Sequence, residues 1–202
     1  MFFRLMYILL YIPARIFFPT KIVGRKNVPK GKCIIVCNHQ TSFDVILLAQ
    51  SLWRKQYYMA KKELFKNKAR GAFIKGIGAF PVDRENVDLK ATRFALNVLK
   101  QNKTLTMFPQ GTRSKGEVNY GNIKTGVCMF AIKEKAPIVP VYIVKKPGIF
   151  KFNKIIFGKP FLLNDFYDKK LDKETLEEAS KIIVDNMSLL TYNNKKIKKN
   201  KN

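Results

Sequence analysis

Short apolar runs alternate with amphipathic stretches along most of the chain. The run CIIVCN at 33–38 is rich in β-branched residues and predicts a buried strand, and DVILLAQSLW at 44–53 predicts the helix that follows. Residues 87–102 place apolar side chains at helical spacing and lead into the predicted strand TLTMF at 104–108. This alternation predicts an α/β fold in a single domain, with a largely parallel central sheet flanked by helices.

The same patterns extend over the rest of the body. They predict further strands at 57–60, 76–84, 136–144 and 154–160, and further helices at 62–67, 125–135 and 173–190. The α/β domain therefore covers residues 21–192. The last stretch, 193–202, is rich in lysine and asparagine, and we expect a basic disordered tail there.

Residues 2–18 are apolar except for two arginines, Arg4 and Arg15. The uninterrupted run from Leu5 to Ala14 is about half as long as a membrane-spanning helix requires. No small-residue cleavage site of the kind found in signal peptides follows it. On a helix, Arg4, Tyr11 and Arg15 would share one face, with apolar side chains around the remainder. We therefore expect an amphipathic membrane-anchoring helix at 1–20; a helix packed on the protein's own core is the alternative.

The charge of the chain is strongly positive, with 39 Lys and Arg against 14 Asp and Glu, or +25. Such a field favours nucleic acid, an anionic lipid surface or an acidic carrier molecule as partner. AT-rich coding also enriches lysine and asparagine, so the charge alone identifies no partner. Cys33, Cys37 and Cys128 have neither metal-like nor disulfide-like spacing, which indicates buried thiols in a reducing compartment.

The only histidine, His39, lies at the carboxyl end of a predicted strand, five positions before Asp44. A turn from strand into helix can bring this carboxylate back to the imidazole. Asp44 could then accept from one ring N–H, which leaves the other ring nitrogen as a base. The H-x-x-x-x-D spacing is weak evidence by itself, because chance matches are common.

Two further strand ends carry arginines, Arg84 and Arg113, whose planar guanidinium suits phosphate. Before Arg113, Gly111 permits a tight turn beside the hydroxyl of Thr112. Lys124 lies at the start of a predicted helix, where unpaired N–H groups favour an anion. In open α/β sheets, ligands bind beyond the carboxyl ends of the strands. We therefore expect these segments to form one site with the histidine.

The segments NHQTSFD, GAFPVDR, FPQGTRS and APIVPVYI follow one another along the chain. Together they resemble the four sequence blocks of the glycerolipid acyltransferases, most closely the 1-acylglycerol-3-phosphate (lysophosphatidate) acyltransferases, over residues 20–160. The resemblance implies transfer of a fatty acyl group from a thioester to the 2-hydroxyl of lysophosphatidate, which makes phosphatidate for phospholipid synthesis. Another lysolipid or glycerol 3-phosphate is the alternative acceptor.

The resemblance also implies roles for individual residues. His39 corresponds to the general base of the family and Asp44 to the carboxylate that orients it. Arg84 and Arg113 correspond to the arginines that bind substrate phosphate. Lys124 is added as a phosphate contact from its place at a helix start.

One position departs from the family pattern. The third block usually reads F-P-E-G-T-R, and Gln110 stands here where the glutamate is usual. Glutamine keeps the size and an acceptor oxygen but loses the charge, which excludes a role as acid or base. We interpret Gln110, Gly111 and Thr112 as a loop that shapes the site.

A thioester is already activated, so the reaction needs orientation, proton removal and stabilisation of an oxyanion. We expect no metal and no cofactor, with acyl-ACP or acyl-CoA (a thioester of acyl carrier protein or of coenzyme A) as co-substrate. The expected partners are an anionic membrane surface, lysophosphatidate and this donor, with no nucleic acid. The expected location is the cytoplasmic face of the cell membrane, as a peripheral or monotopic protein.

Three other interpretations stay open from the sequence. Cys37, two residues from the histidine, permits a cysteine-dependent acyl transferase or hydrolase. A nucleic-acid-binding protein would explain the charge, although the sequence has no zinc finger and no RNP1-like segment. A non-catalytic membrane protein with the family fold would be consistent with the missing glutamate.

Overall fold

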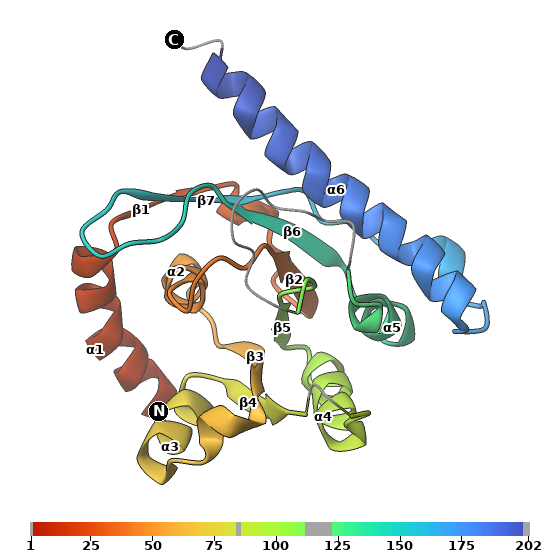
Figure 1. The fold of residues 1–202 in the computed structure, drawn as a ribbon, viewed down its shortest axis with the longest axis horizontal. Helices are drawn as coiled ribbons and strands as arrows, with labels where there is room; N and C mark the ends of the chain where they lie inside the picture. Colours follow the sequence, from red (N-terminus) through yellow and green to blue (C-terminus); the bar gives the residue numbers. More distant parts are fainter. Residues whose placement is uncertain (1, 84–85, 112–122, 200–202) are drawn as a thin grey trace.

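The computed structural model describes residues 2–83, 86–111 and 123–199. Within these residues, seven strands form one sheet in the order β1-β7-β6-β2-β5-β3-β4 (Figure 1). All neighbouring strands are parallel except β6 and β7. The predicted α/β domain with a largely parallel sheet is confirmed. The strands are β1 Thr20–Val23, β2 Cys33–Cys37, β3 Gln56–Lys61, β4 Ala79–Val82, β5 Thr104–Met107, β6 Ile138–Ile143 and β7 Asn153–Phe157.

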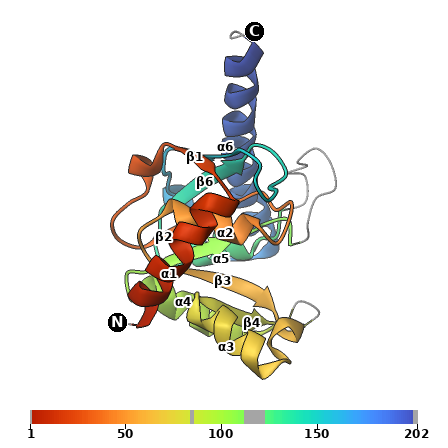
Figure 2. The same cartoon turned by 90° about the vertical axis from the view of Figure 1, so that its left-hand side faces the viewer.

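Helices cover both faces of this sheet (Figures 1 and 2). One face packs against α4, α5 and α6, and the opposite face packs against α2, on which α1 lies in turn. Strand β2 contributes to both cores: Ile34 faces the first and Ile35 the second, because successive side chains of a strand point to opposite faces. The helices are α1 Phe2–Phe17, α2 Asp44–Ser51, α3 Lys68–Gly76, α4 Leu89–Lys100, α5 Gly126–Lys133 and α6 Lys173–Lys199.

Two elements had no clear signal in the sequence. Strand β1 is only four residues long, and its pairing with β7 is what makes it a strand. Helix α3 contains two glycines and lacks a strong apolar stripe. It begins instead from a local cap, in which the Asn67 side chain accepts a hydrogen bond from the backbone N–H of Arg70 at 2.9 Å. The helix predicted at 62–67 is a short 3₁₀ turn, Lys62–Phe65.

One face of α1 packs on the protein. The ring of Tyr11 lies 4.7 Å from that of Trp53, and Phe18, directly after the helix, is buried against Phe43. Arg15 donates a hydrogen bond to the backbone oxygen of Thr20 at 2.8 Å. Tyr11 and Arg15, which we expected on the polar face of a membrane-anchoring helix, therefore contact the protein itself.

The other face of α1 is apolar and exposed. Leu9, Ile12 and Ile16 follow one another at helical spacing, and each is about 60% exposed. Among the described residues, no helix combines the length and the apolar character needed to cross a membrane. The helix thus packs on the body of the protein and leaves a second apolar stripe uncovered.

Helix α6 continues to Lys199, past the point where the sequence predicted a disordered tail to begin. Asn194 lies in this segment, is buried, and accepts a hydrogen bond from Lys154 of β7 at 2.8 Å. Lysines at the C-terminal end also suit the negative end of the helix dipole. The contact between Lys154 and Asn194 thus accompanies the extension of α6 to Lys199, and the amino-acid composition of this segment does not reveal that contact.

Candidate active site

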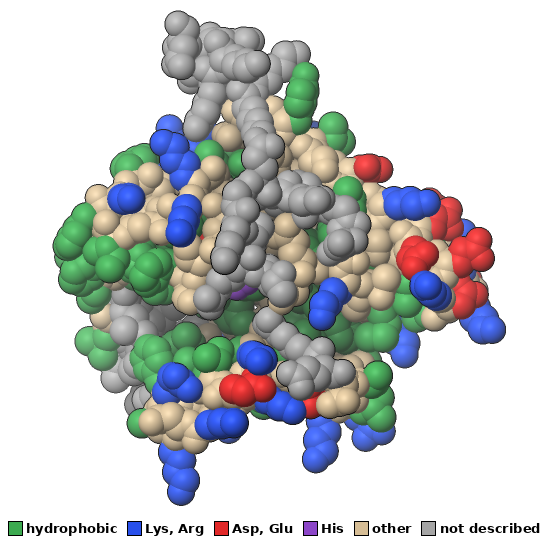
Figure 3. Space-filling view, viewed as in Figure 1, with side chains coloured by type: hydrophobic (Ala, Val, Ile, Leu, Met, Phe, Trp, Pro, Cys, Tyr) green, Lys and Arg blue, Asp and Glu red, His purple; other side chains and the backbone are tan. Residues whose placement is uncertain are grey.

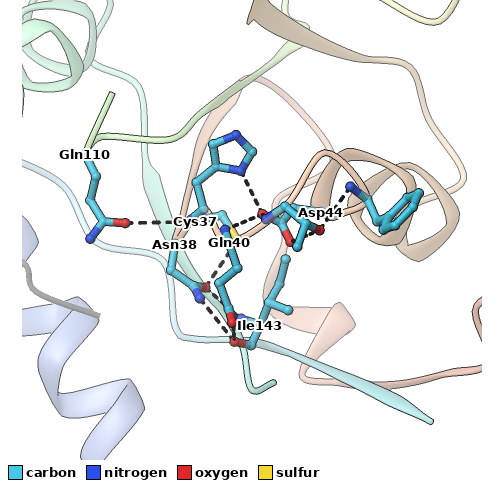
Figure 4. A network of polar contacts seen from close by, with 9 residues as sticks. Cys37, Asn38, Gln40, Asp44, Gln110 and Ile143 are labelled. Carbon is cyan, nitrogen blue, oxygen red and sulfur yellow. Dashed lines mark hydrogen bonds and ion pairs between the residues drawn. The ribbon is translucent and has the colours of Figure 1, made fainter. Parts of the chain in front are cut away.

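Asn38, the residue directly after β2, holds the first part of the loop that carries the candidate site. The side chain of Asn38 is fully buried and forms two hydrogen bonds with the backbone of Ile143, the last residue of β6. Its Nδ2 donates to the Ile143 oxygen at 3.1 Å, and its Oδ1 accepts from the Ile143 N–H at 2.8 Å (Figure 4). Gln40 donates to the same oxygen at 2.8 Å. These bonds hold the loop after β2 against the neighbouring strand.

His39 and Asp44 come together in this loop. Nδ1 of His39 lies 2.7 Å from Oδ2 of Asp44, the first residue of α2, whose side chain is fully buried. The same oxygen accepts the backbone N–H groups of Gln40 at 2.6 Å and Thr41 at 2.9 Å (Figure 4). An ionised carboxylate can only accept hydrogen bonds, so the ring proton lies on Nδ1. The lone pair of the neutral imidazole is then on Nε2.

The segment after β5 supports the imidazole from another side. The ring of Phe108 stacks on that of His39, with centroids 4.1 Å apart and planes inclined by 22°. Gln110 lies two residues further on, and its Oε1 accepts from the backbone N–H of His39 over a long 3.5 Å. Thus the amide that replaces the family's glutamate lies next to the histidine backbone.

Gly111 brings Lys124 to the same place. Its backbone has a left-handed φ of 69°, and its N–H donates to the oxygen of Phe108 at 3.0 Å. A Cβ at this position would lie only 2.7 Å from Cε of Lys124, so the lysine side chain runs across the space that the missing side chain leaves. The Lys124 N–H also donates to Pro109 at 2.9 Å. The left-handed conformation favours glycine here, and a larger residue would also displace the end of the lysine side chain.

The structure therefore brings together His39, Asp44, Gln110, Gly111 and Lys124. The other predicted site residues, Arg84, Thr112 and Arg113, lie outside the described residues, and their contacts stay predictions.

Sequence reasoning missed Asn38 and Phe108 as parts of this site. Asn38 had a readable signal: a polar residue directly after a strand of five apolar or thiol side chains is expected to be buried and therefore to need hydrogen-bond partners. Phe108 was interpreted only as the end of a strand, and no sequence pattern pairs it with an imidazole 69 positions away.

Cys37 is poorly placed as a nucleophile. Its side chain is fully buried in the core between the sheet and α2. Burial raises the pKa of this thiol well above its ordinary value, and the neighbouring carboxylate of Asp44 raises it further. A neutral thiol without access to solvent is unreactive. The geometry thus argues against the cysteine-dependent mechanism.

An apolar cavity of about 300 Å³ lies between α2, α1 and α3. Val45 and Ile46, the two residues that follow Asp44, line it, and it continues along α2 to Ala49. Helix α1 contributes Tyr11, Pro13, Ala14 and Phe17 to its wall, and α3 contributes Phe73 and Gly76. Cavities of this size and lining commonly hold the apolar part of a ligand.

Comparisons with known proteins agree with this arrangement. A family model described as Acyltransferase matches residues 19–144. A 1-acyl-sn-glycerol-3-phosphate acyltransferase of Bacillus subtilis is 39% identical over 153 residues, which cover 72% of this chain and 75% of the relative. A Streptococcus pneumoniae protein of the same name is 35% identical over 154 residues, 73% of this chain and 56% of the relative.

The crystal structure of a 1-acyl-sn-glycerophosphate acyltransferase from Thermotoga maritima has the same fold. It superposes with a TM-score of 0.65 over 89% of this chain and 72% of that chain, at 22% sequence identity.

Proposed function

Because the chain belongs to the acyltransferase family, we propose that it transfers a fatty acyl group from a thioester to the 2-hydroxyl of lysophosphatidate. The observation that carries this proposal is the 2.7 Å contact of His39 with the buried Asp44, at the carboxyl end of a central strand. The names of the Bacillus and Streptococcus relatives, both 1-acyl-sn-glycerol-3-phosphate acyltransferases, support lysophosphatidate as the acceptor. Another lysolipid or glycerol 3-phosphate would require the same chemistry.

In the proposed reaction, Nε2 of His39 takes the proton of the 2-hydroxyl as its oxygen attacks the thioester carbonyl. Asp44 stabilises the imidazolium through the Nδ1 proton. When the tetrahedral intermediate collapses, the new C–O ester bond remains and the C–S bond breaks. The imidazolium returns its proton to the leaving thiolate. The products are phosphatidate and a free thiol, and no acyl-enzyme is formed.

The phosphate of the acceptor suits the cationic side of the site. Lys124 lies against Gly111 in the turn that also carries Gln110, and its side chain is exposed. We assign Lys124, together with Arg84 and Arg113, to phosphate binding, because paired guanidinium and ammonium groups recognise phosphate oxygens. Gln110 would act through the His39 backbone and keep the imidazole in place.

The apolar cavity along α2 supports a place for one acyl chain. Val45 and Ile46, the two residues that follow Asp44 in the sequence, line it, and its wall is almost entirely apolar. Burial of methylene groups there is favourable by about 0.8 kcal/mol each. The donor is a thioester of acyl carrier protein or of coenzyme A.

Both the substrate and the product are membrane lipids, so we place the protein at the cytoplasmic face of the cell membrane as a peripheral or monotopic protein. The uncovered stripe Leu9, Ile12 and Ile16 of α1 supports this location. Such a stripe can enter the boundary between headgroups and acyl chains while the opposite face of the helix stays packed on the body of the protein.

The test is an acyltransferase assay with the purified full-length protein. Lysophosphatidate, another lysophospholipid and glycerol 3-phosphate are offered in turn, each with acyl-CoA and with acyl-ACP, and products are identified by mass spectrometry. We expect phosphatidate from lysophosphatidate with at least one donor. Acylation of another acceptor alone would show that this acceptor, and not lysophosphatidate, is the substrate. No acylation of any acceptor with either donor would contradict the proposed enzyme.

A further inference from the structure

The loop between β6 and β7 carries large apolar side chains into solvent. Ile149, Phe150 and Phe152 are 52%, 69% and 73% exposed. The loop begins directly after Ile143, the residue that fixes Asn38. Exposed clusters of this kind are unfavourable in water and indicate an interaction surface. Because β6 runs parallel to β2, this surface and the candidate active site both lie at the carboxyl ends of these strands.

The loop is fixed to the end of α1. The backbone N–H of Phe150 donates to the oxygen of Phe17, the last residue of α1, at 2.7 Å, and the two rings lie 5.3 Å apart. Phe150 has a left-handed φ of 56°, a conformation that residues with a Cβ rarely adopt. Such backbone strain is retained where the surrounding structure holds it, commonly at functional sites.

The loop and the helix thus form one surface, which we call the apolar rim. It can be followed where the end of α1 meets the β6–β7 loop in Figure 1, and hydrophobic side chains gather there in Figure 3. Its members are Ile12, Ile16, Phe17, Ile149, Phe150 and Phe152, each at least 45% exposed.

The segments that build the apolar rim carry charge of one sign. Lys145, Lys146 and Lys151 belong to the same loop as Phe150 and Phe152, and all three are exposed. The sequence has no Asp or Glu at 1–43 and none at 135–164, so both segments that build the rim lack acidic residues. On the face shown in Figure 3, most acidic side chains gather instead where α6 begins.

We propose that the β6–β7 loop is a second membrane contact, in which Phe150 and Phe152 enter an anionic bilayer while Lys145, Lys146 and Lys151 bind lipid headgroups. Aromatic side chains flanked by lysines fit the boundary of such a bilayer, where both the apolar and the charged contacts are favourable. The inference rests on the proposed membrane location. It adds to that location a loop outside the N-terminal helix, which would direct the carboxyl edge of the sheet toward the lipid.

Binding of the full-length protein to lipid vesicles tests this inference, with no acyl donor or acceptor present. The vesicles are phosphatidylglycerol mixed with phosphatidylcholine, and phosphatidylcholine alone. The apolar variant is Phe150→Asn with Phe152→Ser, since asparagine tolerates a left-handed backbone. Its control is Leu189→Ser with Tyr192→Ser, two comparably exposed residues of α6. The charge variant is Lys145→Gln with Lys146→Gln, and its control is Lys170→Gln with Lys173→Gln.

We expect the apolar variant to bind anionic vesicles at least about tenfold more weakly than the wild type and its control. The charge variant should lose affinity for anionic vesicles only. Circular dichroism checks that each variant is folded. Binding of the apolar variant that equals wild-type binding would overturn the inference, and so would equal wild-type affinity for the two kinds of vesicle.

The same variants separate this inference from the proposed function. With a short-chain, water-soluble lysophosphatidate, the apolar variant should retain wild-type activity. If vesicle binding depends on the loop but no acyl transfer occurs, the proposed function fails and the membrane contact stands. If acyl transfer occurs but vesicle binding does not depend on the loop, the membrane contact fails and the enzyme stands.

Discussion

The side chain of Asn38 and the backbone of Ile143 form two reciprocal hydrogen bonds, at 2.8 and 3.1 Å, between the ends of β2 and β6. The residue that follows Asn38 is His39, so the position of the imidazole depends on this pair. The strand ends thus define where the base lies before any substrate binds.

Replacement of Asn38 by alanine should therefore affect both stability and catalysis. The change removes two buried hydrogen bonds and should lower the free energy of unfolding by about 1–3 kcal/mol. Urea denaturation measures this loss, and Asn97→Ala, at an exposed position of α4, is the control. An Asn38→Ala protein with unchanged stability and unchanged acyl transfer would contradict the role of this bond pair.

Substitution of the His39–Asp44 pair tests the proposed base. His39→Ala should lower the rate of acyl transfer by about 10²–10⁴-fold, because general-base help is of this size. Asp44→Asn removes the charge that favours the imidazolium and should lower the rate by about 10²-fold or more. A steady-state assay with saturating lysophosphatidate measures both, and wild-type rates in the His39→Ala protein would remove this residue from the mechanism.

Substitutions of Gln110 test whether activity depends on a hydrogen-bond acceptor or on a negative charge at this position. Its Oε1 accepts from the His39 backbone at 3.5 Å, and a glutamate would keep an acceptor at the same place. Gln110→Glu should therefore retain activity within about threefold, whereas Gln110→Ala, which removes a hydrogen bond, should lose about three- to tenfold. The same assay decides between them. A large gain of activity in Gln110→Glu would instead show that charge at this position matters.

Ala49 lies in the wall of the apolar cavity, so a larger side chain there should shorten the space for an acyl chain. We expect Ala49→Phe to shift donor preference toward shorter chains, measured across saturated donors from octanoyl to stearoyl. Ala69→Phe, at an exposed position of α3, is the control and should leave the preference unchanged. An unchanged profile in a folded Ala49→Phe protein would exclude this cavity as the site of the donor's acyl chain.

The buried thiols predict a loss of stability in alkali. Burial is the main cause that raises the pKa of Cys33, Cys37 and Cys128 in the folded protein. The unfolded chain ionises its thiols near about pH 8.5, whereas the folded protein keeps them neutral to higher pH. Their stabilising contribution is therefore complete below about pH 8.5 and decreases as the pH rises above it, by up to about 1.4 kcal/mol per pH unit for each thiol.

Urea denaturation between neutral and alkaline pH, with wild type and Cys37→Ala, measures this contribution. The variant should lose less stability than the wild type as the pH rises. It should also retain acyl transfer, because the proposed mechanism forms no acyl-enzyme. Abolished transfer in a folded Cys37→Ala protein would support the cysteine-dependent mechanism.

Sequence patterns predicted the elements that bury continuous apolar runs, such as β2, and those with a clear helical stripe, such as α4. They failed for β1 and α3, whose form depends on pairing with β7 and on the cap at Asn67 rather than on periodicity. In the site, the spacing from His39 to Asp44 was readable because both lie in one turn. The stacking of Phe108 joins segments far apart in sequence, and only the fold brings them together.

The antiparallel pairing of β6 and β7 determines where the N-terminal helix ends. Because β1 runs parallel to β7, it runs opposite to β2 and begins at the edge where β2 finishes. The chain therefore enters the sheet beside the loop that carries the histidine, and Phe18 packs against Phe43 there. In a wholly parallel sheet, the chain would instead enter at the amino ends of the strands, about 15–20 Å away across a five-residue strand. Because of this one antiparallel pairing, the chain enters the sheet at the same end of the strands where the proposed chemistry takes place.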